Sequence, residues 1–127
     1  MDRRLRRAAV IAACVSTLTF TAVAYAVTSD LTDWNLTEST STWPTAYHIS
    51  AGGSVVSFRW LDSPSKTTII SANRCSDLAQ YGASSYGVND TSYHGLFSGP
   101  SGTCFYLRGR TGAGQGSMVN HDGRVQR

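Results

Sequence analysis

Three histidines are the side chains best suited to acid–base or metal chemistry in this chain of 127 residues. They are His48, His94 and His121, and they lie far apart in the sequence. Zinc motifs place their histidines a few residues apart, so this spacing predicts no metal site, and we expect no cofactor. A Ser–His–Asp triad is recognised by geometry, and the sequence has no G-x-S-x-G turn. A small extracellular hydrolase with one histidine as general base therefore stays an alternative, with no catalytic residue assigned.

Carboxylates and glycine-rich segments give no second catalytic pattern. After residue 26 the only glutamate is Glu38, which lies in a stretch rich in serine and threonine. A pair of desolvated carboxylates, as glycosidases need, is therefore not indicated. The glycine-rich segment 109–116 lacks the G-x-G-x-x-G spacing of a phosphate-binding loop. The sequence thus identifies no reaction.

Residues 1–26 have the pattern of a secretory signal. Four arginines lie within the first seven residues, an apolar run follows, and the segment ends in Ala24-Tyr25-Ala26. This order of basic, apolar and small residues is typical of a signal peptide. We expect cleavage after Ala26 and secretion of a single domain, residues 27–127, that is extracellular or associated with the cell wall. Retention of the segment as a membrane anchor is the alternative. The excess of arginine over the single lysine, Lys66, is typical of a bacterial genome rich in GC.

Two cysteines and a balanced charge characterise residues 27–127. Cys14 lies in the signal, so Cys75 and Cys104 remain, and an even number in an oxidising compartment predicts one disulfide between them. The net charge of +3 comes from the signal, because the rest of the chain holds seven basic and seven acidic residues. A nucleic-acid partner is therefore not indicated.

Aromatic side chains are the strongest indication of binding. Three tryptophans and five tyrosines follow residue 26, and most of them lie in polar or loop-like stretches. Because Trp and Tyr are rigid, amphipathic contact residues, they predict a surface for an extracellular protein or a cell-wall polysaccharide. The candidate contact residues are Trp34, Trp43, Tyr47, Tyr81, Tyr86 and Tyr93. Packing of these side chains over the ends of the fold is the alternative.

Charge is segregated along the chain. Residues 27–42 carry Asp30, Asp33 and Glu38 and no basic residue, whereas residues 104–127 carry four arginines and one aspartate. The arginines are Arg108, Arg110, Arg124 and Arg127. Two hypotheses follow. Either the acidic segment lies against the basic one and neutralises it, or the arginines contact an anionic envelope polymer or an acidic partner.

Short strands dominate the pattern after residue 26. Residues 54–61 alternate apolar and polar side chains, which predicts a half-buried strand. Residues 67–71 are β-branched and are predicted to pair with that strand as a hairpin. Residues 92–97 and 103–108 are predicted as two further strands.

Four other segments are assigned from their turn and cap residues. Residues 76–82 are predicted as one short helix, capped by serine and ended by glycine. Residues 117–126 are predicted as a hairpin that turns at Asp122-Gly123. Residues 109–116 are predicted as a loop, and residues 27–44 as either a flexible arm or an edge strand.

These elements predict an all-β fold: a small antiparallel β-sandwich or barrel with one short helix, stapled by one disulfide. The sequence favours a secreted non-catalytic module that binds a protein or polysaccharide, because the domain is small, has one disulfide, carries aromatic residues in loops and shows no catalytic pattern. A hydrolase inhibitor is one form of such a module. The alternatives are the small hydrolase and a structural protein of the cell envelope or spore surface. Contact with a membrane is expected only through the signal. The sequence predicts neither the ligand nor the oligomeric state.

Overall fold

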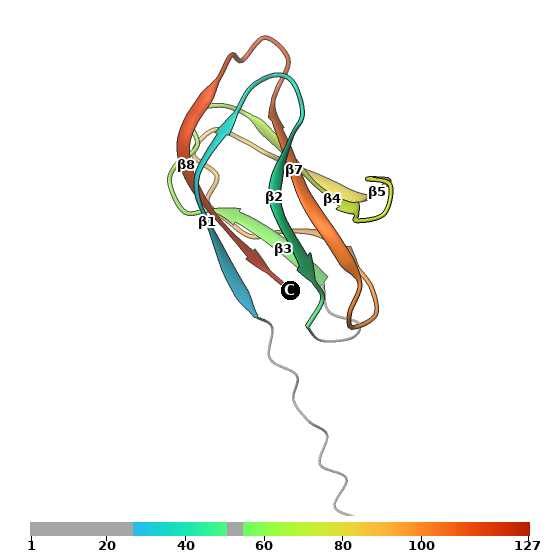
Figure 1. Ribbon diagram of the computed structural model, residues 1–127. Coiled ribbons are helices and arrows are strands. Elements are labelled where there is room, and N and C mark those ends of the chain that lie inside the picture. The colour runs from blue at the N-terminus through green and yellow to red at the C-terminus, as the bar shows by residue number, and fades with distance from the viewer. Residues whose placement is uncertain (1–26, 51–54) are drawn as a thin grey trace, which may run out of the picture.

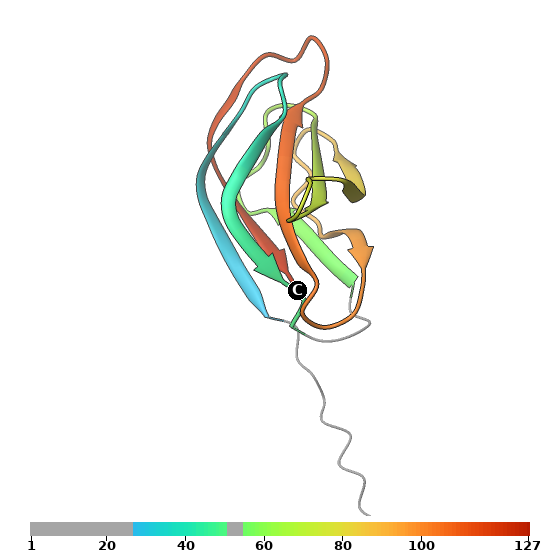
Figure 2. The same ribbon diagram turned by 45° about the vertical axis from the view of Figure 1, so that its right-hand side comes forward.

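The residues that the structure describes form two four-stranded antiparallel sheets. The computed structural model describes residues 27–50 and 55–127, so the predicted secretory signal lies outside the described residues. We call the sheet with strand order β1-β8-β3-β6 sheet A and the sheet with order β2-β7-β4-β5 sheet B. The strands are β1 (Thr28–Leu36), β2 (Ser41–His48), β3 (Val55–Trp60), β4 (Thr68–Arg74), β5 (Gln80–Tyr86), β6 (His94–Ser98), β7 (Cys104–Thr111) and β8 (Met118–Gln126). The sheets face each other as two layers (Figure 1 and Figure 2), which confirms the predicted all-β, sandwich-like fold.

Alternation of side chains along the strands builds the core between the sheets. In β3, Val56, Phe58 and Trp60 are fully buried, while Ser57 and Arg59 between them point to the outer face. In β7, every second residue from Phe105 onward is buried in the same way. A period of two is what a strand with one solvated face requires.

Phe58 lies at the centre of the aromatic core. Its ring centroid is 5.0 Å from that of Trp60, 5.7 Å from that of Tyr86 and 6.2 Å from that of Trp34, each pair edge to face. Such pairs contribute about 0.5–1.5 kcal/mol each beyond the area that they bury. Because Phe58 belongs to sheet A and Tyr86 to sheet B, their contact joins the two layers.

The predicted disulfide between Cys75 and Cys104 is confirmed. Cys75 directly follows β4 and Cys104 begins β7, and these strands are neighbours in sheet B. The two Cα atoms are 5.6 Å apart. The bond therefore ties the ends of two adjacent strands that are 29 residues apart in sequence.

The predicted helix at residues 76–82 is wrong, and no helix occurs in residues 27–50 and 55–127. The segment holds a tight turn followed by the start of β5. The Leu78 amide donates to the Arg74 carbonyl at 2.8 Å, but the Arg74 amide donates to the Ala79 carbonyl, which returns the chain to β4. Leu78 has φ +60°, a left-handed conformation that ends a single helical turn. Pairing of β5 with β4 thus outweighs a helical propensity that extends over fewer than two turns.

Asp77 stabilises this turn through an exposed ion pair. Its carboxylate accepts hydrogen bonds from Arg74 at 2.6 and 2.8 Å and from the Ala79 amide at 3.0 Å. The hydrogen bonds from Arg74 and, to a smaller extent, from the Ala79 amide lower the pKa of Asp77 to about 2. The unfolded value is about 3.9, so the stabilisation is fully present above pH ~4 and is lost as the pH falls through ~2.

We therefore expect Asp77→Asn to lower the melting temperature at pH 6 by a small amount, because exposed pairs are weak. The difference between the variant and the wild type should shrink between pH 4 and pH 2. Thermal unfolding of both proteins at pH 6, 4 and 2 measures this. A difference that is the same at all three pH values would contradict the role of the ionised carboxylate.

The hairpin predicted to turn at Asp122-Gly123 is wrong, because both residues lie inside the single strand β8. A type I′ turn needs positive φ at both central residues, and neither residue has it. Gly123 serves a different purpose. A Cβ at this position would lie 2.5 Å from the Phe58 ring, so the glycine makes room for the core aromatic.

The hairpin predicted between residues 54–61 and 67–71 is also wrong. β3 pairs with β6 and β8 in sheet A, whereas β4 pairs with β5 and β7 in sheet B. The turn after β3 reverses the chain but carries it across to the other layer. The Trp60 Nε1 at the end of β3 donates to the Thr68 hydroxyl of β4 at 2.9 Å, so this bond links the two sheets.

The N-terminal segment and the glycine-rich segment both supply strands. β1 pairs with β8 along most of its length, and β2 begins at Ser41, so both are edge strands and not a flexible arm. The glycine-rich segment 109–116 is not all loop, because β7 continues to Thr111. The register pairs Ser41 of β2 with Gly109 of β7, which fixes the two neighbours in sheet B.

Candidate functional site

The predicted contact aromatics do not form one surface. Trp34, Tyr47 and Tyr86 are buried in the core, so they cannot present their rings to a partner, and this part of the prediction is corrected. Their polar or loop-like sequence surroundings predict exposure, but β1, β2 and β5 turn these side chains inward.

The other three aromatics reach the surface separately. Trp43 is half-buried, and its Nε1 donates to the Tyr47 hydroxyl at 3.1 Å. Tyr81 is 38% exposed and stacks on Phe97, with ring centroids 4.7 Å apart. Tyr93 is 40% exposed, and the Cζ atom of Arg59 lies over its ring, 5.5 Å from the ring centroid.

Two of the four predicted anion-contact arginines bind the protein itself. Arg124 pairs with Asp30 across β1 and β8, with the closest N–O distance 2.6 Å. This contact holds the pKa of Asp30 below its ordinary value. Arg127 donates to the His48 carbonyl at 3.0 Å, and its guanidinium lies 5.6 Å from the centroid of Tyr47. The acidic N-terminal segment therefore lies against the basic C-terminal strand, as the first of the two charge hypotheses expects.

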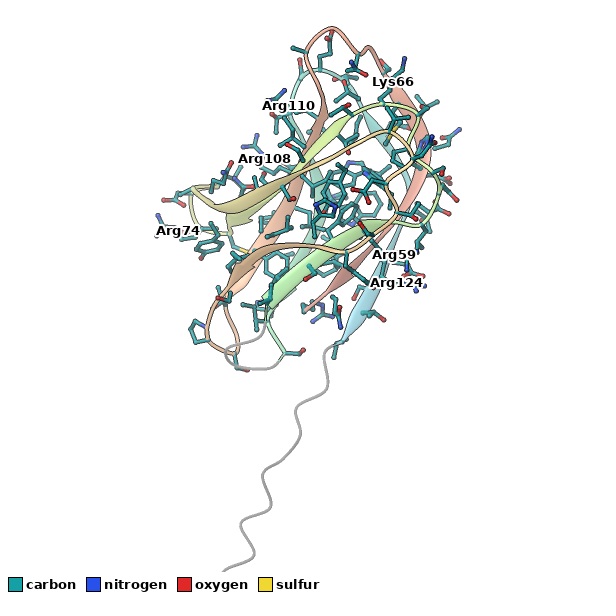
Figure 3. All side chains as sticks on the ribbon, turned by 180° about the vertical axis from the view of Figure 1, so that it is seen from behind. Arg59, Lys66, Arg74, Arg108, Arg110 and Arg124 are labelled. Carbon is teal, nitrogen blue, oxygen red and sulfur yellow. A yellow bond between two sulfur atoms is a disulfide. The ribbon has the colours of Figure 1, made fainter. Side chains whose placement is uncertain are left out.

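Arg108 and Arg110 lie elsewhere, on the outer face of sheet B. They are two residues apart on β7, so both point away from the core (Figure 3). The Arg108 Nε donates to the Thr42 hydroxyl at 3.0 Å, and the Arg110 Nη1 lies 3.4 Å from the Thr111 carbonyl oxygen. Within the described ranges, neither guanidinium pairs with a carboxylate.

A shallow groove of about 170 Å³ lies between these arginines and their neighbours. Register places Ser71 of β4 opposite Arg108 and Ile69 opposite Arg110. The groove is lined by Thr40, Ile69, Ser71, Asn73, Gln80, Arg108, Gly109 and Arg110. Two unpaired cations, two amides and two hydroxyls thus surround one opening, which we call the arginine groove.

Sequence reasoning missed Ser71, Asn73 and Gln80. The strand predicted from the β-branched pattern ends at residue 71, but β4 continues to Arg74 and brings Asn73 beside Ser71. The Ser71 hydroxyl donates to the Asn73 Oδ1 at 2.6 Å, and the Asn73 Nδ2 donates to the Leu78 carbonyl at 2.9 Å. These bonds fix the two side chains on the floor of the groove. Two polar residues in alternate positions of a strand were the signal that could have found them.

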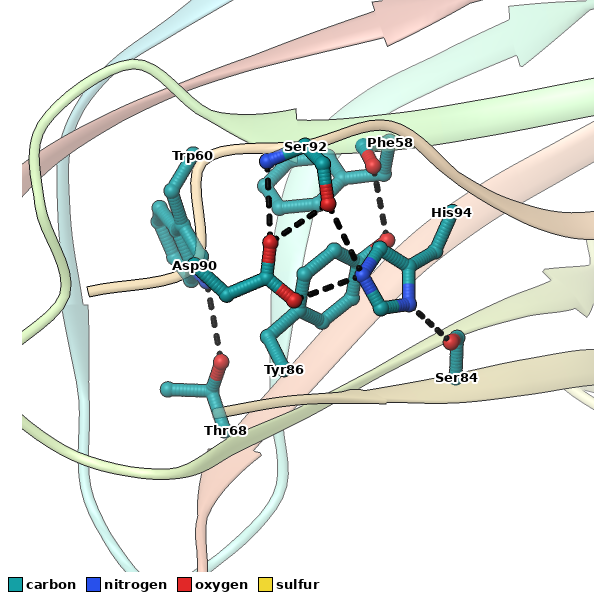
Figure 4. A network of polar contacts seen from close by, with 8 residues as sticks. All are labelled: Phe58, Trp60, Thr68, Ser84, Tyr86, Asp90, Ser92 and His94. Atoms are coloured by element: carbon teal, nitrogen blue, oxygen red, sulfur yellow. Dashed lines mark hydrogen bonds and ion pairs between the residues drawn. The ribbon is translucent and has the colours of Figure 1, made fainter. Parts of the chain in front are cut away.

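A second polar cluster joins β5 to β6. The Ser84 hydroxyl lies 2.9 Å from Nδ1 of His94, and Nε2 of His94 lies 2.7 Å from a carboxylate oxygen of Asp90 (Figure 4). The Ser92 hydroxyl and amide, together with His94, hold the pKa of Asp90 below its ordinary value. The Tyr86 ring packs on the imidazole with centroids 4.2 Å apart. The side chains of His94 and Asp90 are 28% and 27% exposed, so solvent reaches the cluster.

The remaining histidines belong to neither cluster. His48 is exposed at the end of β2, and Nδ1 of His121 lies 2.8 Å from the Val119 carbonyl. Across the described residues no three His, Cys, Asp or Glu side chains gather where they could hold a metal ion. The part of the chain with assigned structure also contains no helix of a length and hydrophobicity that would cross a membrane.

Over residues 27–50 and 55–127, the fold is an eight-stranded antiparallel sandwich with one disulfide. It has an arginine groove on one sheet and a Ser–His–Asp cluster at one side. No family model, curated protein or solved structure matches this chain.

Proposed function

We propose that this protein is a secreted module that binds an acidic polysaccharide in the arginine groove. The observation that carries the proposal is the pair Arg108 and Arg110, which line one groove from the same face of β7 and have no carboxylate partner in the described ranges. The strand repeat places the Cα atoms of these two like-charged residues about 7 Å apart on one face of β7. Bringing them together without a counter-charge costs free energy, which an anionic ligand would offset.

The other groove residues suit a sugar. The exposed Thr40 hydroxyl and Gln80 amide can donate to and accept from ring hydroxyls, above the floor that the bonded Ser71 and Asn73 form. A guanidinium binds carboxylate or phosphate in a bidentate way, which suits the acidic group of the polymer. Ile69 is the only large apolar side chain in the lining, whereas the centre of a protein interface is apolar and aromatic. These features favour polysaccharide over protein as the ligand.

Secretion is part of the proposal. The disulfide in sheet B is consistent with an extracellular protein, because such bonds persist in oxidising compartments. Anionic polymers are common outside cells, where they would reach the groove directly.

Binding of a carboxylated polysaccharide and of the same polymer after reduction of its carboxyl groups tests the proposal. The purified oxidised protein should bind the acidic form and not the neutral one, and added salt should weaken the complex. Affinity electrophoresis measures both. Equal retention by the two polymers would contradict the proposal.

The double variant Arg108→Gln/Arg110→Gln should weaken this binding by about tenfold or more, since each charged hydrogen bond contributes ~1.5–3 kcal/mol. The matched control is Arg59→Gln/Arg124→Gln, which removes the same charge from the outer face of sheet A (Figure 3). The control should bind as the wild type does. A similar loss in both double variants would mean that net charge, and not the groove, holds the polymer.

A further inference from the structure

The cluster at the side of the sandwich has the parts of a nucleophilic site, distinct from the arginine groove. Ser84 lies on β5 of sheet B, His94 begins β6 of sheet A, and Asp90 lies in the connection between them. The two strands touch here without pairing. A Cβ on Gly82 of β5 would lie 1.9 Å from the Leu96 carbonyl oxygen of β6. The side chains of Ser84 and His94 are therefore held opposite each other by backbones in direct contact.

The carboxylate fixes the proton positions on the imidazole. Asp90 is ionised at neutral pH and can only accept, so Nε2 of His94 carries the proton that it donates across 2.7 Å. In the neutral ring Nδ1 then has a free lone pair, and the Ser84 hydroxyl donates to it across 2.9 Å. In the common serine hydrolases Nε2 faces the serine and Nδ1 faces the aspartate, so the two nitrogens have exchanged partners here. Even so, the nitrogen that faces Asp90 carries the proton, and the nitrogen that faces Ser84 has the free lone pair.

Packing holds this arrangement in place. The Tyr86 ring lies against the imidazole, and its hydroxyl donates to the Phe58 carbonyl at 2.7 Å (Figure 4). The carboxylate of Asp90 is oriented in turn by the hydroxyl and amide of Ser92. Preorganised partners of this kind distinguish a general base from a surface histidine.

We propose that Ser84 is a nucleophile that cleaves carboxylic esters, with His94 as its general base and Asp90 as a positioning residue. The proposal goes beyond the binding function and does not depend on it. The Ser84 oxygen attacks the ester carbonyl while its proton passes to Nδ1 of His94. The bond from the carbonyl carbon to the alkoxy oxygen breaks, and His94 returns the proton to release the alcohol. Water then attacks the acyl–Ser84 ester, His94 again relays a proton, and the carboxylic acid leaves with Ser84 restored.

The surroundings favour an ester over an amide. The site lies at the surface, with the side chains of His94 and Asp90 28% and 27% exposed, so it offers little binding energy to activate a poor leaving group such as an amine. β5 is an edge strand, so every second N–H along it points away from β4, and a developing oxyanion beside Ser84 can accept from one of these groups.

Labelling with an alkyl fluorophosphonate tests Ser84 as a nucleophile. The serine oxygen displaces fluoride from phosphorus, and peptide mass mapping locates the adduct. We expect the adduct on Ser84 of the oxidised full-length protein. Ser85 is the internal control, because it is the next residue on the same strand and is more exposed.

Two variants separate catalysis from a structural role. Ser84→Ala should abolish the adduct, and Asp90→Asn should slow labelling at least tenfold and alter its pH dependence, while both keep the circular dichroism of the wild type. Hydrolysis of a short-chain aryl ester should fall in parallel in both variants. Labelling of Ser84 no faster than of Ser85 in the folded wild type would overturn the proposal. The polysaccharide experiment would be unaffected by that result, because the groove variants leave Ser84 in place.

Discussion

Replacing Phe58 by alanine should lower the free energy of unfolding by about 3–5 kcal/mol. The ring is fully buried and contacts aromatic side chains of both sheets, among them Trp60 and Tyr86. Removing it leaves a cavity in the one core that holds the layers together, and domains of this size have only about 5–15 kcal/mol of stability. Urea denaturation followed by tryptophan fluorescence measures the loss.

Phe97→Ala is the matched control for Phe58. Phe97 is only partly buried and packs against Tyr81 and Phe105 near the surface. Its removal should cost clearly less than that of Phe58. Equal losses of unfolding free energy in the two variants would mean that Phe58 is not the main packing contact between the sheets.

Removing the disulfide by Cys75→Ala/Cys104→Ala should cost about 3–4 kcal/mol, the loop entropy expected for 29 residues. The bond lies inside sheet B, between strands that pair in any case, so the folded layers should remain similar. Denaturant unfolding of the variant and of the oxidised and reduced wild type measures this effect. Unchanged stability of both the variant and the reduced protein would show that the bond does not restrict the unfolded chain.

The parts of the fold that could be predicted from sequence are those set by local alternation. The strands predicted at residues 54–61 and 103–108 correspond to β3 (Val55–Trp60) and β7 (Cys104–Thr111), and in both every second residue is buried. The cysteine pair followed from number and compartment alone. Neither inference needs knowledge of which strands become neighbours.

The parts that failed depend on contacts distant in sequence. Residues 76–82 have the caps of a helix, but β4 offers the segment a full row of backbone partners. Asp122-Gly123 has the composition of a turn, yet its glycine is explained by the Phe58 ring from another strand. The sequence indicates a reversal between residues 61 and 67. It does not indicate that this reversal carries the chain to the second sheet.

The candidate sites divide in the same way. The arginines were found as a group of four, and only the pairing of β1 with β8 shows that Arg124 is occupied by Asp30. The cluster of Ser84, Asp90 and His94 lies within eleven residues of sequence, but its members come from two sheets. Their geometry could not be inferred from spacing, because a triad has no fixed order.

Nuclear magnetic resonance of the ¹⁵N-labelled oxidised protein, titrated with a carboxylated oligosaccharide, tests the arginine groove most directly. We expect the amide shifts to concentrate on residues 108–110 of β7 and 71–73 of β4, and to disappear with the carboxyl-reduced oligosaccharide. Shifts centred on Arg59 and Arg124 of sheet A, or spread evenly over the protein, would contradict it.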